Sequence, residues 1–260
     1  VDANLCADTL RWIALLEGGA PVWLEPVSEP KAAAACIALA RRPPAASAVV
    51  RPGSNEAADS PNLVPLRLPL QGLAFVSPNE GELIAMVTAL RDAHDDNQSG
   101  STITSLRDEQ SGQLSEAALR NAAAALVRAG VVNVIVTRGP LGILWARSSR
   151  AFGPAGEVSF EVLAPPSARV ESTRGAGDTF VAGVTWGLLR GVTRPAGAGG
   201  VAEPAPRGNF ARRIDPYDHE VVRAALRAGL RAAQLTVESD AAVAETLTTG
   251  ELERAYSLLD

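Results

Sequence analysis

The sequence of 260 residues predicts an α/β fold in which a mainly parallel sheet carries helices on both faces. The first observation is an alternation along the chain, where short apolar or β-branched runs separate longer segments with helical periodicity. The second is composition, because 47% hydrophobic and 20% charged residues are typical of a globular protein with a sizeable core. In such folds ligands bind outside the carboxyl ends of the strands, so we expect reactive residues directly after strands.

The first half of the chain supplies the parallel part of the predicted sheet. An amphipathic pattern predicts a helix over 7–16, and a short apolar run predicts a strand over 21–25. Turn residues then precede an Ala-rich helix over 31–41. The apolar run 73–76 ends at a Ser-Pro pair and predicts a second strand, which a helix over 79–90 follows.

The second half of the chain continues the alternation and then changes direction. Helical periodicity predicts a helix over 116–129, and β-branched residues predict a strand over 131–136. Two runs at 142–146 and 157–163, joined through a turn region with Gly and Pro, predict strands at an antiparallel edge. The last predicted helices cover 176–189, 220–237 and 252–259.

Three segments interrupt this pattern, at 43–61, 94–113 and 192–216. Their Gly, Pro, Ser, Asp and Asn content predicts mobile surface insertions, because such residues bury too little apolar surface to offset the entropy of ordering. The α/β alternation resumes after each of them. We therefore expect residues 1–260 to belong to one domain.

The net charge of the chain argues against some classes of binding partner. A net charge of −5 and a pI near 5.2 argue against nucleic-acid polymers and anionic membranes as partners, and favour a small-molecule substrate. No apolar run has the length of a membrane span.

Cys6 and Cys36 fall in helical patterns and predict buried packing in a reducing, cytoplasmic compartment. The chain begins at Val1 with the pattern of a strand exit, so we expect a missing upstream part, which leaves an organellar location open.

The most informative stretch is Ser172–Phe180, with the sequence S-T-R-G-A-G-D-T-F. Gly175 and Gly177 permit a tight turn whose backbone amides converge at the start of a helix, which is an anion-binding arrangement. Asp178 beside it could take a proton from a substrate hydroxyl during phosphoryl transfer. The alternative is a plain helix start capped by a short polar residue.

Two further motifs follow predicted strands. Asn79 and Glu82 lie three residues apart at a helix start, where an amide and a carboxylate could orient a phosphate and a hydrated Mg²⁺. The alternative for this pair is a capping box. Thr137, Gly139 and Gly142 form a glycine turn against which a nucleotide could lie, and the alternative is an ordinary β-turn.

Together, in this order and at strand ends, the three elements resemble the ribokinase-like (PfkB-type) carbohydrate kinase family. That family carries an N-x-x-E element, a T-x-G-x-x-G nucleotide turn and a [D/N/S]-T-x-G-A-G-D-x-F motif. The resemblance covers essentially the whole chain, from Asp2-Ala3-Asn4 to Ser239. It implies a three-layer ribokinase-like fold that acts with ATP and Mg²⁺, and it admits a monovalent cation and a homodimer.

The resemblance also implies a role for each motif residue at the reacting centre. Asp178 would be the general base. The amides of Gly175, Ala176 and Gly177 would stabilise charge on the transferring phosphoryl group.

The other two motifs would hold the donor. Asn79 and Glu82 would organise Mg²⁺ and the phosphates, with Glu82 acting through water and no residue bound to the metal directly. Thr137, Gly139 and Gly142 would line the ATP site.

Within the family, the strings D-A-N-L and A-D-T-L near the start, and E-P-V-S followed by Lys31, resemble pseudouridine kinases. These enzymes phosphorylate the 5′-hydroxyl of the C-nucleoside, and in eukaryotes many are fused to a glycosidase that cleaves the product. The resemblance implies substrate or phosphate contacts for Asp2, Asn4, Lys31 and Thr173. For Lys31, a solvated lysine at a helix start is the alternative.

The sequence departs from the family pattern in two places. Arg174 stands where the family favours a small or β-branched residue, and it could contact a phosphate or point outward. The N-terminal strands, the Gly-Gly motif and the small β lid of the family are missing from this sequence. If these residues are the whole expressed chain, we expect an incomplete sheet and little or no kinase activity.

Other functions compete with this one. A kinase-like remnant that binds nucleotide or a partner without turnover, or a sister kinase for ribose, a hexose or adenosine, would fit the same motifs. P-loop, Rossmann, serine-hydrolase and zincin motifs do not occur in the sequence. We expect the two histidines, His94 and His219, to be surface residues.

Overall fold

The computed structural model describes residues 21–26, 28–40, 70, 72–94, 114–148, 157–193 and 214–257. The predicted helix over 7–16 and the insertion 43–61 lie outside these residues, as do 95–113 and 194–213. In chain order the described elements are β1 (Val22–Leu24), α2 (Glu29–Ala40), β2 (Leu73–Val76), α3 (Glu80–His94), α4 (Glu116–Arg128), β3 (Asn133–Thr137), η2 (Gly139–Leu141), β4 (Ile143–Ser148), β5 (Val158–Leu163), α5 (Ala176–Thr193), α6 (His219–Val237) and α7 (Thr249–Ser257).

The five described strands form one mixed sheet in the order β1-β2-β3-β4-β5. β1, β2 and β3 run parallel, with Trp23 opposite Phe75 and Val76 opposite Val134. β4 pairs antiparallel with β3, and β5 pairs antiparallel with β4. The antiparallel edge predicted from the sequence is therefore confirmed.

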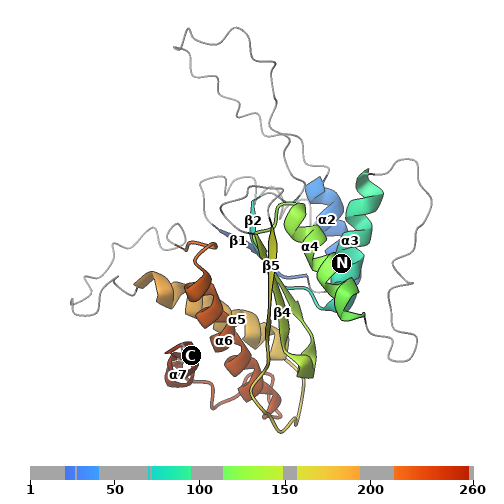
Figure 1. Ribbon diagram of the computed structural model, residues 1–260. Helices are drawn as coiled ribbons and strands as arrows, with labels where there is room; N and C mark the ends of the chain where they lie inside the picture. Colours follow the sequence, from blue (N-terminus) through green and yellow to red (C-terminus); the bar gives the residue numbers. More distant parts are fainter. Residues whose placement is uncertain are drawn as a thin grey trace, which may run out of the picture.

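Helices cover both faces of the sheet (Figure 1): α2, α3 and α4 lie on one face, and α5 and α6 lie on the other. The side chains of β3 alternate between these layers, as a strand's period of two requires. Val134 and Val136 join the core beneath α3 and α4, whereas Ile135 joins the core beneath α5 and α6. The three-layer α/β architecture predicted from the sequence is confirmed.

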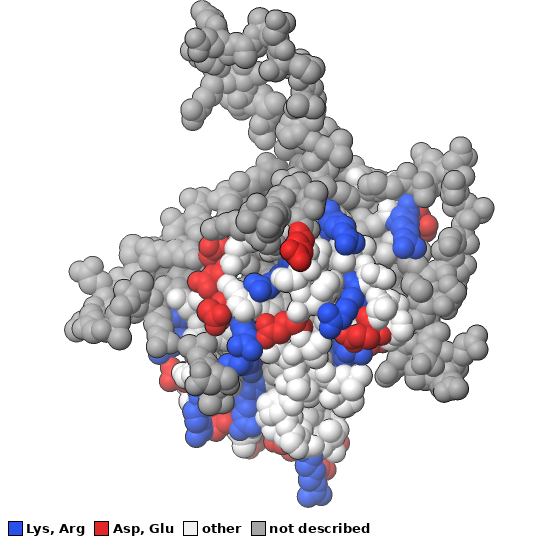
Figure 2. Space-filling model, viewed as in Figure 1, with Lys and Arg blue, Asp and Glu red and all other residues white. Residues whose placement is uncertain are grey.

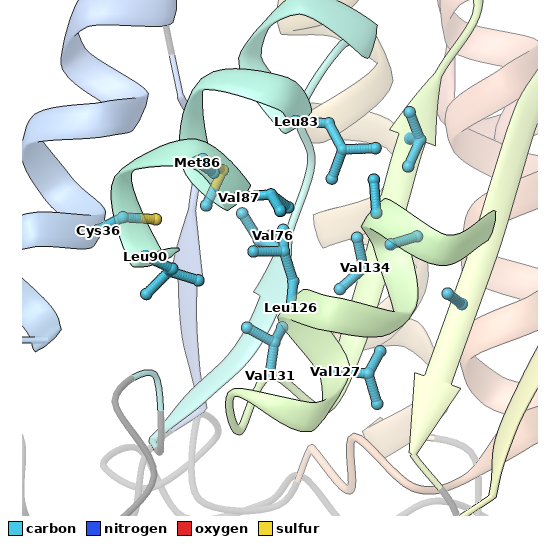
Figure 3. Packing of buried hydrophobic residues seen from close by; sticks show 14 of the residues in the cluster. Cys36, Val76, Leu83, Met86, Val87, Leu90, Leu126, Val127, Val131 and Val134 are labelled. Carbon is cyan, nitrogen blue, oxygen red and sulfur yellow. The ribbon is translucent and has the colours of Figure 1, made fainter. Parts of the chain in front are cut away.

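The larger core contains Cys36 of α2, Met86 of α3 and Leu126 of α4, all without solvent exposure (Figure 3). Their side chains come from three helices and meet over Val76 and Val134 of the sheet. The predicted buried packing of Cys36 is confirmed, and burial raises the pKa of its thiol to about 12.

Helix α5 and helix α6 pack closely against each other because glycines face the contact. A Cβ at Gly187 would lie 2.6 Å from Ala225 Cα, and one at Gly183 would lie 2.9 Å from Ala228 O. The two backbones can approach this closely only without those side chains. This contact fixes α5, whose first turn carries the Ser172–Phe180 motif.

Helix ends differ slightly from the predictions. His94 is the last residue of α3 and Thr193 the last of α5, so the insertions predicted to begin at 94 and 192 were placed too early. In both helices the helical hydrogen bonds extend beyond the last residue of the apolar pattern from which the helix end was predicted. None of the helices in the described part of the chain is long and apolar enough to cross a membrane.

Candidate active site

The predicted site lies where the parallel strands end. Glu25 follows β1, Ser77 follows β2, and Thr137 is the last residue of β3. The segments after β2 and β3 touch, because the Thr137 amide donates to Pro78 O at 2.9 Å and Asn79 forms an isolated parallel bridge with Thr137. The Asn79 and Thr137 motifs, 58 residues apart in sequence, are therefore neighbours.

Asn79 and Glu82 form a reciprocal cap at the start of α3. The Asn79 amide donates to Glu82 Oε2 at 2.9 Å, and the Glu82 amide donates to Asn79 Oδ1 at 2.9 Å. The capping-box alternative is thus realised. The cap engages one carboxylate oxygen of Glu82 and the amide oxygen of Asn79, and it holds both side chains in fixed positions beside the end of β2.

The carboxylate of Glu82 is buried, which raises its pKa; the Asn79 amide opposes that rise and the nearby charge of Glu29 adds to it. Such a group would be stabilised in its ionised form by a cation. No group of three or more His, Cys, Asp or Glu side chains in the described residues is arranged to hold a metal ion directly.

Glu25 begins the E-P-V-S string, but no site role was predicted for its carboxylate. Its carboxylate accepts a hydrogen bond from Ser77 Oγ, and Ser77 Oγ accepts one from Trp23 Nε1 at 2.7 Å. Glu25 is exposed as a residue, yet its carboxyl end is held against Ser77 and loses solvent, which raises its pKa to about 7. The charges of Glu82 and Asp178 contribute to the rise, so each of these two carboxylates lies near Glu25.

The Ser172–Phe180 motif forms a turn and then the first residues of α5. Gly175 has φ +76°, and a Cβ there would lie 2.0 Å from Ala242 O, so only glycine fits. Asp178 is exposed in the first turn of α5. The Ala176 amide makes a long hydrogen bond to Thr173 O at 3.4 Å, whereas the amides of Gly175, Gly177 and Asp178 donate to no described residue. Of these three, Gly177 and Asp178 lie in the first turn of α5, where the helix dipole also favours an anion.

The segment before Gly175 is anchored to the end of α6. The amides of Glu171 and Ser172 donate to Val237 O at 2.7 and 3.2 Å. Gln234 Nε2 donates to Ser167 O at 2.7 Å. These long-range hydrogen bonds hold the start of the motif against the C-terminal end of α6.

The turn after β3 needs glycine at both of its predicted positions. Gly139 has φ +53° and Gly142 has φ +80°. A Cβ at Gly142 would lie 2.1 Å from Leu163 O, so this turn packs against the end of β5. The prediction of a glycine turn behind a strand is confirmed, with a short 3₁₀ helix inside it.

Three exposed hydrophobic residues belong to segments that adjoin the motifs. Leu141 lies in the turn after β3, Val170 in the segment that leads to the motif, and Val243 in the segment that packs on Gly175.

The other predicted site residues have varied placements. Lys31 is exposed in the first turn of α2, and Thr173 is exposed beside Gly175, as is Arg174. Asp2 and Asn4 lie outside the described residues, as does Cys6. His219 is partly exposed: its side chain is 32% exposed, stacks on the Trp145 ring at 5.2 Å and contacts Glu161 and Glu220. The side chain of His94 is not among those described.

Comparison with known proteins now identifies the family. A family model for the pfkB family carbohydrate kinases matches residues 65–249, a stretch that contains all three motifs. The chain belongs to the pfkB family of carbohydrate kinases. No curated protein matches the sequence.

Solved structures of this pfkB-family fold resemble the chain. A candidate sugar kinase from Clostridium perfringens has a TM-score of 0.51 at 12% identity, with 98% of this chain and 52% of that chain covered. Phosphofructokinase-2 from Escherichia coli, solved with substrates and products, has a TM-score of 0.51 at 17% identity, again with 98% and 52% covered. These likenesses concern the fold, which is ribokinase-like. The chain spans about half the length of the kinases it matches.

Proposed function

We propose that the pfkB-family protein containing this chain transfers the γ-phosphate of ATP to a hydroxyl group of a sugar or nucleoside. The observation that carries the proposal is the position of Asp178. It is exposed in the first turn of α5, directly behind a glycine turn with available amides, and it lies near the carboxylate of Glu25. A base beside an anion hole is what attack of an alcohol on a phosphoryl group requires.

In this mechanism the acceptor hydroxyl gives its proton to the Asp178 carboxylate as its oxygen attacks the γ-phosphorus. The bond from that phosphorus to the β-γ bridging oxygen breaks, and ADP leaves. The amides of Gly177 and Asp178 and the positive end of the α5 dipole stabilise the negative charge on the phosphoryl oxygens. Ala176 contributes less to this hole than its neighbours because its amide is already directed at Thr173 O.

The acidic residues at the strand ends suit a hydrated Mg²⁺. Glu82 and Glu25 would hold the ion through water, since Mg²⁺ keeps several waters and needs few protein ligands. When bound, Mg²⁺ neutralises phosphate charge during the transfer. The fit rests on the raised pKa values of both carboxyl groups, which a nearby cation would lower.

The surface around the motifs suits a nucleotide as donor. Leu141, Val170 and Val243 offer apolar contact for a base close to the anion hole, and the Thr137–Gly142 turn permits close approach of the backbone. On the face in Figure 2 acidic and basic side chains are interspersed, which suits a small-molecule substrate better than a polyanionic polymer.

For the acceptor we propose the 5′-hydroxyl of pseudouridine. The support is the sequence resemblance at E-P-V-S and Lys31, together with the placement of Glu25 in that string beside Asp178. A panel of pseudouridine, uridine, ribose, adenosine and fructose, tested with the full-length protein, checks this choice. Faster turnover with any other acceptor would reassign the substrate and leave the phosphotransfer proposal intact.

Replacing Asp178 with Asn tests the mechanism. We expect ATP-dependent phosphorylation by the full-length protein to fall by about two to four orders of magnitude, because a positioned base contributes roughly that factor. Binding of ATP should stay within about twofold, since the substitution removes a base and not a nucleotide contact. Calorimetry of ATP binding beside a turnover assay measures both.

The matched control is Asp240→Asn, because Asp240 is an acidic residue in the segment after α6 and has no part in the mechanism. Near-normal turnover by Asp178→Asn would refute the role of Asp178. ATP binding without turnover by the unmodified full-length protein would instead indicate a nucleotide-binding remnant.

A further inference from the structure

Arg138 lies inside the Thr137–Gly142 turn, yet its side chain is only 12% exposed. Its Nε is 3.2 Å from Glu80 Oε1, and its Nη1 is 3.1 Å from Glu116 Oε2. Glu80 is the first residue of α3 and Glu116 the first of α4. One guanidinium group therefore joins the end of β3 to the starts of two helices.

This arrangement needs arginine in particular. Two of its nitrogens reach two carboxylates from separate, fixed positions of the planar guanidinium, whereas an ammonium group offers its three donors from one point. Both carboxylates also lie at helix N-termini, where the helix dipole favours negative charge. The ion pairs are shielded from water on the arginine side, so they are stronger than exposed pairs.

The backbone of Arg138 is part of the glycine turn itself. Its amide donates to Gly142 O at 2.8 Å, and its carbonyl accepts from the Leu141 amide at 3.1 Å. Because these backbone groups belong to the turn, displacing the Arg138 side chain would also shift the turn. On the other side, Glu80 directly follows Asn79, whose side chain is paired with Glu82.

We propose that Arg138 is a positioning residue that fixes the Thr137–Gly142 turn relative to the Asn79–Glu82 cap, so that both contact one nucleotide. The Arg138–Glu80 pair adds a side-chain link to the main-chain link between Thr137 and Pro78. The inference rests on the proposed function, because it takes the bound molecule to be a nucleotide. Arg138 itself is not placed in contact with that nucleotide.

The test is calorimetric binding of Mg²⁺ with a non-hydrolysable ATP analogue to the chain. We expect Arg138→Lys and Arg138→Met each to bind about 10- to 100-fold more weakly, the range expected when a binding group is misplaced by about 1 Å. The lysine variant keeps the charge but cannot hold both carboxylates. Affinity of Arg138→Lys within twofold of the unmodified chain would overturn the proposal.

Arg120→Met is the matched control. Arg120 bonds to the other oxygen of the same Glu116, with Nε 2.9 Å from Oε1, but does so from within α4. We expect this variant to bind the analogue normally. An equal loss of affinity for the analogue in Arg120→Met and Arg138→Lys would show that the loss comes from Glu116 or α4. This result would also overturn the proposal.

A kinetic measurement separates positioning from general destabilisation. In the full-length protein, Arg138→Lys should raise KM for ATP about tenfold or more and leave KM for the acceptor unchanged, because the acceptor does not contact this turn. A parallel change in both constants would refute positioning. Failure of the unmodified chain to bind the analogue at all would count against the proposed function, which is a distinct result.

Discussion

At the scale of single residues, Glu25 shows how neighbouring groups change the pKa of a carboxylate in the site. It stands in the E-P-V-S string, for which no role at the reacting centre was predicted, and its carboxyl group has a pKa of about 7 because it loses solvent and lies near Glu82 and Asp178. Below that pH it is protonated and neutral, and above it the group is ionised. A proton and a cation therefore compete for the same carboxylate at neutral pH.

We expect the affinity of the chain for Mg²⁺ with the ATP analogue to rise with pH between about 6 and 8, because ionised Glu25 attracts the cation. In Glu25→Gln this dependence should flatten, with affinity near the low-pH value of the unmodified chain. Calorimetry at pH 6, 7 and 8 measures it.

Glu253→Gln is the control for this prediction, because Glu253 lies on α7 and pairs with Arg190 away from the strand ends. It should keep the pH dependence of the unmodified chain. A Glu25→Gln variant that retains the full dependence would show that another group is responsible.

At the scale of elements, the contact between α5 and α6 supports the site. A Cβ at Gly187 would meet backbone and side-chain atoms of Ala225 at 2.6 and 2.8 Å, so Gly187→Ala must push the helices apart. We expect a loss of about 1–3 kcal/mol in the free energy of unfolding, as is usual for overpacking. Chemical denaturation measures the loss.

Gly250→Ala is the matched control at element scale. The nearest atom to a Cβ at Gly250 is Thr248 Oγ1 at 3.9 Å, an ordinary contact. Because alanine favours the helix, this variant should be neutral or more stable by up to about 1 kcal/mol. Equal destabilisation of the two variants would contradict the role given to the close helix contact.

Elements were predictable from the sequence where their signal is local. The β-branched run before Thr137 and the glycine turn after it depend on neighbouring residues, and both appear as expected. The groups that were missed depend on distant partners: Glu25 needs Ser77, which is 52 residues away, and Arg138 needs Glu80, which is 58 residues away. The contacts of His219 with Trp145 and Glu161 were not predictable for the same reason, since these neighbours come from β4 and β5.

At the scale of the whole molecule, the sheet separates two hydrophobic layers. Leu126 lies in the layer under α2, α3 and α4, and Leu226 lies in the layer under α5 and α6; neither has solvent exposure. The strands contribute side chains to both layers, so we expect the layers to unfold together.

Replacing either leucine with alanine should lower the free energy of unfolding by about 2–5 kcal/mol, the usual cost of such a truncation in a core. In each variant, circular dichroism and tryptophan fluorescence should report the same denaturation midpoint. Separate midpoints for the two signals would show that the layers unfold independently.

The order of the strands in the sheet is the same as their order along the chain. Each described strand after β1 therefore pairs with the described strand that precedes it in the chain, and none of the five described strands has to insert between two that are already paired. During synthesis from the N-terminus, every new strand can add to an edge that is already present. The sheet can thus grow in one direction as the ribosome delivers the chain, and β3, β4 and β5, which are close in sequence, should pair with the least loss of chain entropy.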